Sequence, residues 1–235
     1  MSDHRMLRLL GVAVACLAVG GSAMSVAGYT HSRTDTHTVA LPSAMGVLDV
    51  SAGFGDVRVG TEGAAGPSAV ARLRWAFQQP TVHTTVDGER VSLSGECPFS
   101  LFQDCSTSWD VAVPEATAVR IRTTSGDISL GGLGGDVTVE TASGDVLGAD
   151  ISAQRVTITA TSGDVDIRLS TAPEAVVVSS TSGSIRLVVP NDGTAYAVQV
   201  TTASGDVKNE LVHAPGAARR IVIETTSGDI EVIRN

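Results

Sequence analysis

The sequence predicts an all-β protein, a β-solenoid or β-helix of about six to seven short rungs that follows an N-terminal apolar helix. Three observations predict this fold. A string of the form T-x-S-G-D-V returns six times, Val and Ile alternate with period two around each copy, and one spacing within the copies stays constant. Period-two alternation indicates strands, and a repeat of about 20 residues indicates stacked units that share one core.

The sequence of residues 1–28 is typical of an export segment. Two arginines precede an apolar run from Leu9 to Val19, and small residues continue to Gly28. The segment is either a signal peptide, cleaved at the "SVA" before Gly28, or a transmembrane signal-anchor helix with its N-terminus in the cytoplasm. Lipid attachment at Cys16 is a third interpretation, although "AVAC" has alanine where a larger aliphatic residue is usual. All three predict either a cell-membrane protein with an extracytoplasmic domain or a secreted protein.

Three regions follow the export segment. Residues 29–38 read "YTHSRTDTHT", and we expect a polar linker there rather than a metal site at His31 and His37. We expect an irregular β region over residues 39–118. Within it, "VLDVSAGFGDVRV" is an early copy of the repeat, and the remaining residues are expected to cover the first regular rung. A cover is expected because an uncovered solenoid end is an open sheet edge. Residues 119–235 hold the regular solenoid repeats.

Two cysteines in the irregular region predict a disulfide. Cys97 and Cys105 lie eight positions apart, on the side of the membrane that we expect to be oxidising. A metal site is the alternative, but neither cysteine has a nearby histidine or a second cysteine pair. We therefore expect a bond that closes a small loop.

The copies are aligned on their glycines, and the six regular copies are counted from Gly126. The turn glycines, with that of the early copy first, are Gly55, Gly126, Gly144, Gly163, Gly183, Gly205 and Gly228. In the regular copies the step across the glycine, between flanking aliphatic residues, is always 9 residues, whereas the step onward to the next copy grows from 9 to 14. This spacing predicts a fixed corner opposite a connection of variable length. Glycine suits such a corner because it adopts positive φ without steric cost.

Side chains between the aliphatic positions are predicted to point outward and to pair across rungs, as Arg122 with Glu140 and Asp166 with Arg186. The sixth copy ends almost at the end of the printed sequence, so little chain remains to cap it. Edge-to-edge self-association is therefore expected at that rung.

The stacked corners raise the question of a metal site. They would place Asp127, Asp145 and Asp164 in one column, where a divalent cation such as Ca²⁺ would relieve carboxylate repulsion. We favour the alternative, in which each aspartate caps its own turn and no metal binds. Ser184 interrupts the column, because the fourth copy reads "SGS".

Neither a catalytic residue nor a cofactor is predicted, and we expect no enzyme. The sequence contains neither G-x-S-x-G nor H-E-x-x-H. Aromatic residues, which sugar-cleaving grooves use as platforms, make up only 3% of the chain. The net charge of −9 argues against nucleic acid as a partner.

The repeat, together with "VAVPEATAVRIRTTSGD" and "RLVVPNDGTAYAV", resembles a bacterial family of putative adhesins of unknown function, over about residues 46–235. The resemblance implies an exported or membrane-anchored β-solenoid without established catalytic residues. We expect a non-catalytic adhesin or protein-interaction scaffold of the cell surface or envelope. Its partner would be a surface protein or glycan, and its N-terminal segment would contact the membrane. The alternatives are an envelope-stress or signalling accessory protein and, less favoured, a carbohydrate-active enzyme.

Overall fold

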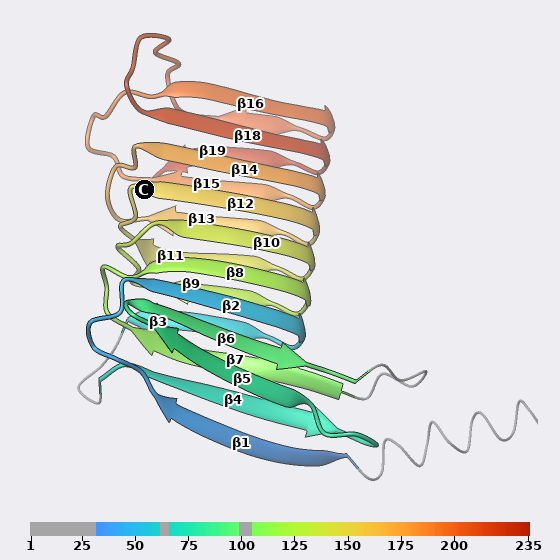
Figure 1. Cartoon of the computed structure of the whole chain (residues 1–235). Coiled ribbons are helices and arrows are strands. Elements are labelled where there is room, and N and C mark those ends of the chain that lie inside the picture. The colour runs from blue at the N-terminus through green and yellow to red at the C-terminus, as the bar shows by residue number, and fades with distance from the viewer. Residues whose placement is uncertain (1–31, 62–65, 99–104) are drawn as a thin grey trace, which may run out of the picture.

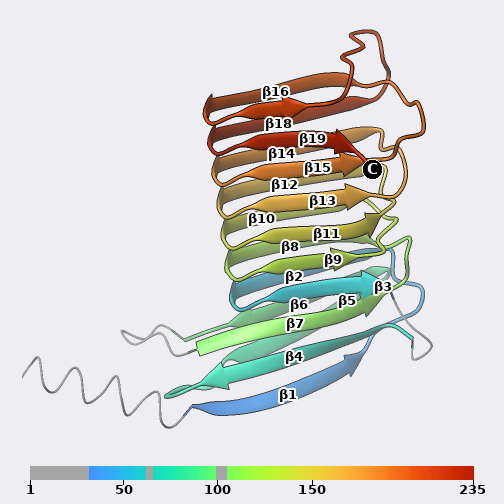
Figure 2. The same ribbon diagram turned by 180° about the vertical axis from the view of Figure 1, so that it is seen from behind.

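The strands of the protein build two long sheets that face each other (Figure 1, Figure 2). The computed structural model describes residues 32–61, 66–98 and 105–235, and every regular element within these ranges is a β-strand. None of the described residues forms a helix long and apolar enough to cross a membrane. The apolar helix expected within residues 1–28, and Cys16 in it, lie outside the described residues. The all-β class is confirmed.

Each sheet is described by its strands in spatial order. Sheet A has ten: β1 (Arg33–Ala40), β4 (Ser68–Trp75), β7 (Cys105–Val113), β3 (Val57–Thr61), β9 (Ile128–Gly131), β11 (Val146–Ile151), β13 (Val165–Leu169), β15 (Ile185–Val189), β19 (Ile230–Arg234) and β17 (Val207–Asn209). Sheet B has nine: β16 (Ala197–Ser204), β18 (Arg220–Ser227), β14 (Ala175–Ser182), β12 (Arg155–Ser162), β10 (Val137–Ser143), β8 (Ala118–Ser125), β2 (Val47–Phe54), β6 (Arg90–Glu96) and β5 (Thr81–Asp87).

Each regular copy contributes one strand to sheet B and the next strand to sheet A, with the glycine corner between them. Neighbouring copies pair in parallel at the aliphatic positions, so that Val137 lies opposite Val156 in sheet B and Val146 opposite Val165 in sheet A. These side chains point into the space between the sheets, where Val139 is fully buried. The period-two alternation therefore predicted the buried face correctly.

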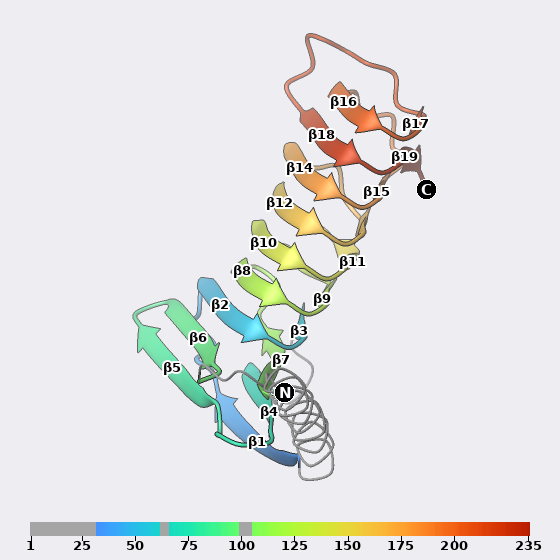
Figure 3. The same ribbon diagram turned by 90° about the vertical axis from the view of Figure 1, so that its right-hand side faces the viewer.

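The N-terminal region closes one end of the stack. β6 pairs with β2 and β7 with β3 in parallel, which adds one more rung outside the early copy. β4 and β1 then extend sheet A, and β5 extends sheet B, all in antiparallel pairing (Figure 3). The inward aliphatic residues of the early copy are thus covered, which removes one exposed solenoid end.

Part of the segment expected as a polar linker is a strand. β1 begins at Arg33, within the expected linker of residues 29–38, and pairs with β4 from Arg33 opposite Trp75 to Ala40 opposite Ser68. Its residues "RTDTHTVA" are mostly exposed. A threonine-rich polar strand suits the outer edge of a sheet, because it pairs the backbone groups of β4 and presents polar side chains to water.

The last two copies exchange places in the stack. β18 lies between β14 and β16, and β19 lies between β15 and β17 (Figure 3). The sixth copy is therefore internal, and the fifth copy, formed by β16 and β17, is the open end. The expectation of an open edge at the sixth copy is wrong. The glycine spacings rise to 22 and 23 at these copies, which supplies the chain needed to pass over one rung and return.

Candidate functional site at the stacked corners

The corner glycines lie directly against one another along one edge of the stack. Gly144 has a φ of 121°, and a Cβ on it would lie 2.2 Å from the carbonyl oxygen of Gly126. A Cβ on Gly163 would meet the carbonyl oxygen of Gly144 at the same 2.2 Å. This overlap is a second reason for glycine besides the positive φ, because no side chain fits between the rungs. All the predicted corner glycines have positive φ: Gly55, Gly126, Gly144, Gly163, Gly183, Gly205 and Gly228.

The corner aspartates connect neighbouring rungs. The N–H of Asp145 donates to Oδ1 of Asp127 at 3.0 Å, and the N–H of Asp164 donates to Oδ1 of Asp145 at 2.8 Å. The N–H of Ser184 donates to Oδ1 of Asp164 at 2.7 Å. We expected each aspartate to cap its own turn, and this is wrong. Stacking presents the backbone N–H of the adjacent rung to each carboxylate.

The three calcium candidates, Asp127, Asp145 and Asp164, do lie in one column. A peptide N–H separates each carboxylate from the next, so a backbone donor already offsets part of the repulsion that a cation would relieve. Within the part of the chain that the structure describes, no group of three or more His, Cys, Asp or Glu side chains is placed to hold a metal ion.

The ladder of aspartates follows the order of the rungs in space. At its N-terminal end, the N–H of Asp56 donates to Oγ of Ser108 at 3.1 Å, so a serine takes the place of the aspartate. At the open end, the N–H of Asp206 donates to Oδ1 of Asp229 at 2.8 Å, in agreement with the exchanged order of the copies. The aspartate thus bonds the N–H of the rung adjacent in space, and among the described residues no such side-chain bond joins Ser184 to the N–H of Asp229.

A hydroxyl three residues before the glycine bonds the corner from inside. Oγ1 of Thr141 donates to the carbonyl of Ser143 at 3.2 Å, and Oγ1 of Thr225 donates to the carbonyl of Ser227 at 3.3 Å. The sequence indicated only that small residues are needed at this position. The frequent Thr or Ser there was the available signal for the hydrogen bond, and Ala160 is the exception.

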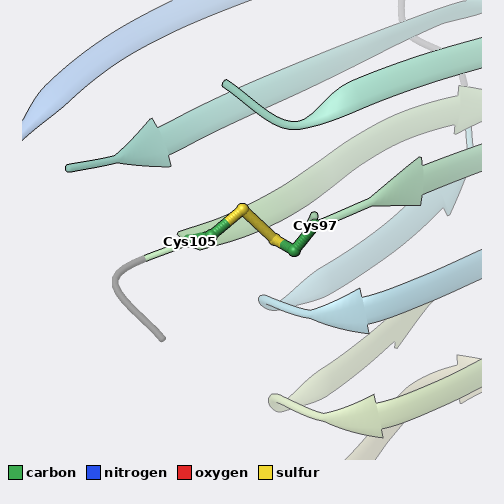
Figure 4. The surroundings of a disulfide bond; sticks show 2 residues. All are labelled: Cys97 and Cys105. Carbon is green, nitrogen blue, oxygen red and sulfur yellow. A yellow bond between two sulfur atoms is a disulfide. The ribbon is translucent and has the colours of Figure 1, made fainter. Parts of the chain in front are cut away.

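The predicted disulfide is present. Cys97 and Cys105 join the end of β6 to the start of β7, with their Cα atoms 5.8 Å apart (Figure 4). The bond lies at the same edge of the stack as the glycine corners. It connects β6 and β7, the two strands of its rung, whereas in the other rungs a Gly-Asp or Gly-Ser dipeptide forms the turn between the two strands. It therefore closes the rung nearest the antiparallel cover.

Beside the corners, sheet A carries a row of alternating charges, which we call the charge ladder: Asp166, Arg186, Glu231 and Lys208, on β13, β15, β19 and β17. Arg186 lies 3.6 Å from Oδ2 of Asp166 and 2.9 Å from Oε2 of Glu231. The Nζ of Lys208 lies 2.7 Å from Oε1 of Glu231. This hydrogen bond lowers the pKa of Glu231 and raises the pKa of Lys208.

The charge ladder explains why the fifth and sixth copies exchange places. Stacking in chain order would bring Lys208 beside Arg186, and like charges directly opposite each other destabilise a sheet. The inward residues also favour the exchanged order, because the internal sixth copy has Ile221, Ile223 and Ile230 where the fifth copy at the end has the smaller Val198, Val200 and Val207. The outward charges, although individually weak, therefore favour the order in which Glu231 separates the two cations. Arg122 and Glu140 pair on sheet B as expected, at 3.0 Å.

A shallow open groove runs along the charge ladder and the adjoining corners. Its lining includes Asp145, Leu147, Asp164, Arg186 and Lys208. Most of its charged groups bond one another or a backbone N–H. The groove is thus suited to contact with a polar partner and offers no free pair of groups for acid–base chemistry.

The outward side of sheet B presents hydroxyl groups over three adjacent strands, β10, β12 and β14. We call this surface the hydroxyl face: Thr138, Thr157, Thr159, Thr161, Ser179 and Thr181. Thr138 lies opposite Thr157, and Thr159 lies opposite Ser179. Each hydroxyl both donates and accepts hydrogen bonds, and parallel strands repeat at about 4.8 Å. The face is therefore a hydroxyl-rich hydrogen-bonding surface, which also holds the exposed Glu140 opposite Thr159 and Val177 opposite Thr157.

Comparisons with known proteins agree with this architecture. The structure is similar to a putative cell adhesion protein from Clostridium sporogenes, with 12% identity and a TM-score of 0.53, over 87% of this chain and 100% of that chain. A putative adhesin from Bacteroides fragilis has 10% identity and a TM-score of 0.49, over 86% of this chain and 97% of that chain. At these identities the first similarity shows a shared fold only.

A family match covers most of the chain. Among curated proteins, none is similar enough in sequence to count as a relative. Residues 81–235 match the model of the Toastrack DUF4097 family. This match agrees with the resemblance that the T-x-S-G-D-V repeats indicated. Because the match covers more than half of the sequence, the chain belongs to the Toastrack DUF4097 family.

Proposed function

We propose that the protein is a non-catalytic binding protein of the cell surface or envelope, an adhesin or interaction scaffold. The observation that carries the proposal is the hydroxyl face, an exposed hydroxyl-rich array on three parallel strands. Export is supported by the apolar segment within residues 1–28 and by the disulfide, which is typical of oxidising compartments. The N-terminal segment would hold the domain at the membrane or direct its secretion.

The partner that suits this surface is a repetitive polar polymer, such as a surface glycan, or the polar surface of a protein. Parallel pairing fixes the hydroxyls before binding, so little side-chain entropy is lost when they bond a ligand. An array of hydroxyls on successive rungs offers hydrogen bonds to successive units of a polymer. The printed name of the Clostridium sporogenes protein, a cell adhesion protein, is in line with this role.

A non-catalytic role is supported by how the titratable groups of the described residues are used. The corner carboxylates accept backbone N–H groups, as Asp127 does from Asp145. Nδ1 of His213 accepts the N–H of Val198 at 3.1 Å, which places this histidine in the packing of a loop.

The test is a binding assay with the purified full-length protein on arrays of glycans and matrix proteins. Thr159→Arg places a bulky cation at the centre of the hydroxyl face, and Thr85→Arg makes the same change at an exposed threonine of β5, in the N-terminal cover, as the matched control. We expect a ligand whose binding weakens by about tenfold or more in the first variant and is retained in the second. Equal binding by both variants would remove the hydroxyl face from the proposal.

An envelope-stress accessory role is the alternative. The charge ladder on sheet A and the hydroxyl face on sheet B would serve as its contact surfaces. A strain lacking the protein separates the two roles. Loss of a transcriptional response to envelope damage, with array binding absent, would replace the adhesin proposal. Release of sugar from cell-wall polymers by the purified protein would overturn both.

A further inference from the structure

The two ends of the stack differ in how they are closed. At one end, β1, β4 and β5 cover the rung formed by β6 and β7 with antiparallel strands (Figure 3). At the other end, β16 and β17 each pair with only one strand of their sheet, β18 and β19. We call this second end the open end. Its outer edges carry backbone groups that no strand among the described residues pairs.

Interior residues of the open end are exposed. Val207 is 47% exposed, whereas Ile185 and Ile230, which occupy the same position in neighbouring copies, are 1% exposed. Val200 is only partly buried, whereas its equivalent Val178 is 1% exposed. Val198 and Leu211, which begins the following loop, are buried, so the exposed inward residues of the fifth copy are those towards the glycine corner.

The edge strand β16 also lacks the features that protect edges in monomeric proteins. Its sequence "AVQVTTAS" contains no charge and no proline, and lysine or proline is the usual protection. The following loop covers only the start of the strand. The N–H of Ala214 donates to the carbonyl of Tyr196, and His213 bonds Val198. The rest of β16, towards the corner, is left uncovered by this loop.

The pairing of β17 shows which backbone groups face outward. The N–H of Glu210 donates to Val232, and the carbonyl of Asp206 accepts from Ile230, so these even-numbered residues bond β19. Because neighbours alternate in a parallel strand, Val207 and Asn209 direct both N–H and C=O to the open edge. An antiparallel strand centred on Asn209 would therefore form a complete hydrogen-bonded pair there.

We propose that the open end pairs with the open end of a second copy of this chain, β17 against β17, about a two-fold axis at Asn209. An antiparallel pair centred on Asn209 places Lys208 of each copy opposite Glu210 of the other. The segment is thus complementary to itself in backbone pattern and in charge, as an isologous interface requires. The partner strand would also lie beside the exposed Val207 of β17. The occupant is a second copy because an unrelated strand would not supply this match.

The first test is disulfide cross-linking of the full-length protein in its native membrane or in detergent. Every variant carries Cys16→Ser, so that the introduced cysteine is the added free thiol. Asn209→Cys lies on the two-fold axis, and mild oxidation is expected to give a covalent dimer. Asp87→Cys, at the covered end, is the matched control and should remain monomeric. Absence of a dimer with Asn209→Cys, or equal dimer with both variants, would overturn the proposal.

The second test uses charge reversal and mixing. In a dimer of the Lys208→Glu variant, the new glutamate of each copy faces Glu210 of the other copy. In a dimer of the Glu210→Lys variant, the new lysine of each copy faces Lys208 of the other copy. Each variant alone should dimerise at least about tenfold more weakly than the native chain in sedimentation equilibrium. An equimolar mixture of the two variants should form a mixed dimer. One of its two ion pairs joins the native Lys208 to the native Glu210, and the other joins the two substituted residues, whose charges are exchanged but still opposite. Mixing cannot restore the contact of Lys208 with Glu231 within one chain, so recovery isolates the interface. No recovery would contradict the two-fold pairing.

Discussion

The Nζ of Lys208 lies 2.7 Å from Oε1 of Glu231, across the adjacent strands β17 and β19, and the exchange of the last two copies also places Glu231 beside Arg186. The contact is one step of the charge ladder, in which Glu231 separates Lys208 from Arg186. A repeat protein with nearly identical cores in every copy needs such outward differences to specify one order of rungs. The relationship therefore connects surface charge to topology.

This contact predicts a loss of stability in acid. The hydrogen bond from Lys208 lowers the pKa of Glu231 from its ordinary 4.5, so the unfolded chain binds the proton more readily than the folded chain. The resulting stability is present above pH 4.5 and is lost as the pH falls through the lower folded-state pKa. Glu231→Gln should melt below the native protein at neutral pH and converge with it in acid. Melting curves between about pH 7 and pH 3 check this, and a constant difference would contradict it.

The overlap at the glycine corners predicts a severe effect of a single methyl group. Gly144→Ala combines a positive φ with a Cβ 2.2 Å from the oxygen of Gly126, and we expect a loss of about 2–4 kcal/mol in the free energy of unfolding. Gly193→Ala is the control, because its φ is 80° but nothing lies within 4 Å of the added Cβ. Chemical denaturation measures both. Equal losses would show that φ strain alone accounts for the glycine.

The aspartate ladder predicts that the acceptor oxygen matters more than the charge. Asp145→Ala removes the acceptor of the N–H of Asp164 and should cost about 0.5–1.5 kcal/mol. Asp145→Asn keeps an oxygen at Oδ1 and should retain most of the stability. Urea unfolding with an unchanged slope measures the difference. A loss as large in the Asn variant as in the Ala variant would instead favour a role for the carboxylate charge.

Calcium should have no specific effect on the folded protein. One oxygen of Asp127 and one of Asp145 accept a backbone N–H from the adjacent rung, and among the described residues no group of three or more His, Cys, Asp or Glu side chains is placed to hold a cation. Titration calorimetry with Ca²⁺ should give no binding heat, and the melting temperature should not rise. A saturable heat that disappears in Asp145→Asn would establish a site in the column.

The disulfide should stabilise the rung beneath the N-terminal cover. It joins β6 to β7 across a sequence separation of 8, and loop-closure arguments give about 2–3 kcal/mol for a loop of this length. Cys97→Ala with Cys105→Ala should therefore lower the melting temperature, as should reduction of the native protein. The double variant should be insensitive to reductant, which is the control. A native protein whose melting is unchanged by reduction would contradict this role.

The local features of the repeat were predictable from the sequence. Val or Ile at period two predicted which residues are buried, except in the fifth copy, where Val207 is 47% exposed, and a glycine at constant spacing located each corner. The disulfide followed from the spacing and compartment of Cys97 and Cys105. The reach of the Asp127 carboxylate to the next rung was missed, since its partner is 18 residues away in sequence.

The sequence by itself thus determined the rung, its corner and its buried side chains, and it identified the family. Only the tertiary structure decided the order of the last two rungs, the addition of β1 to the sheet, and which end stays open. The physical reason is that the copies offer their neighbours similar inward aliphatic residues, so the differences in the core between one order and another are small. The choice depends on weaker outward terms, such as Glu231 between Arg186 and Lys208, which exist only after the strands are assembled.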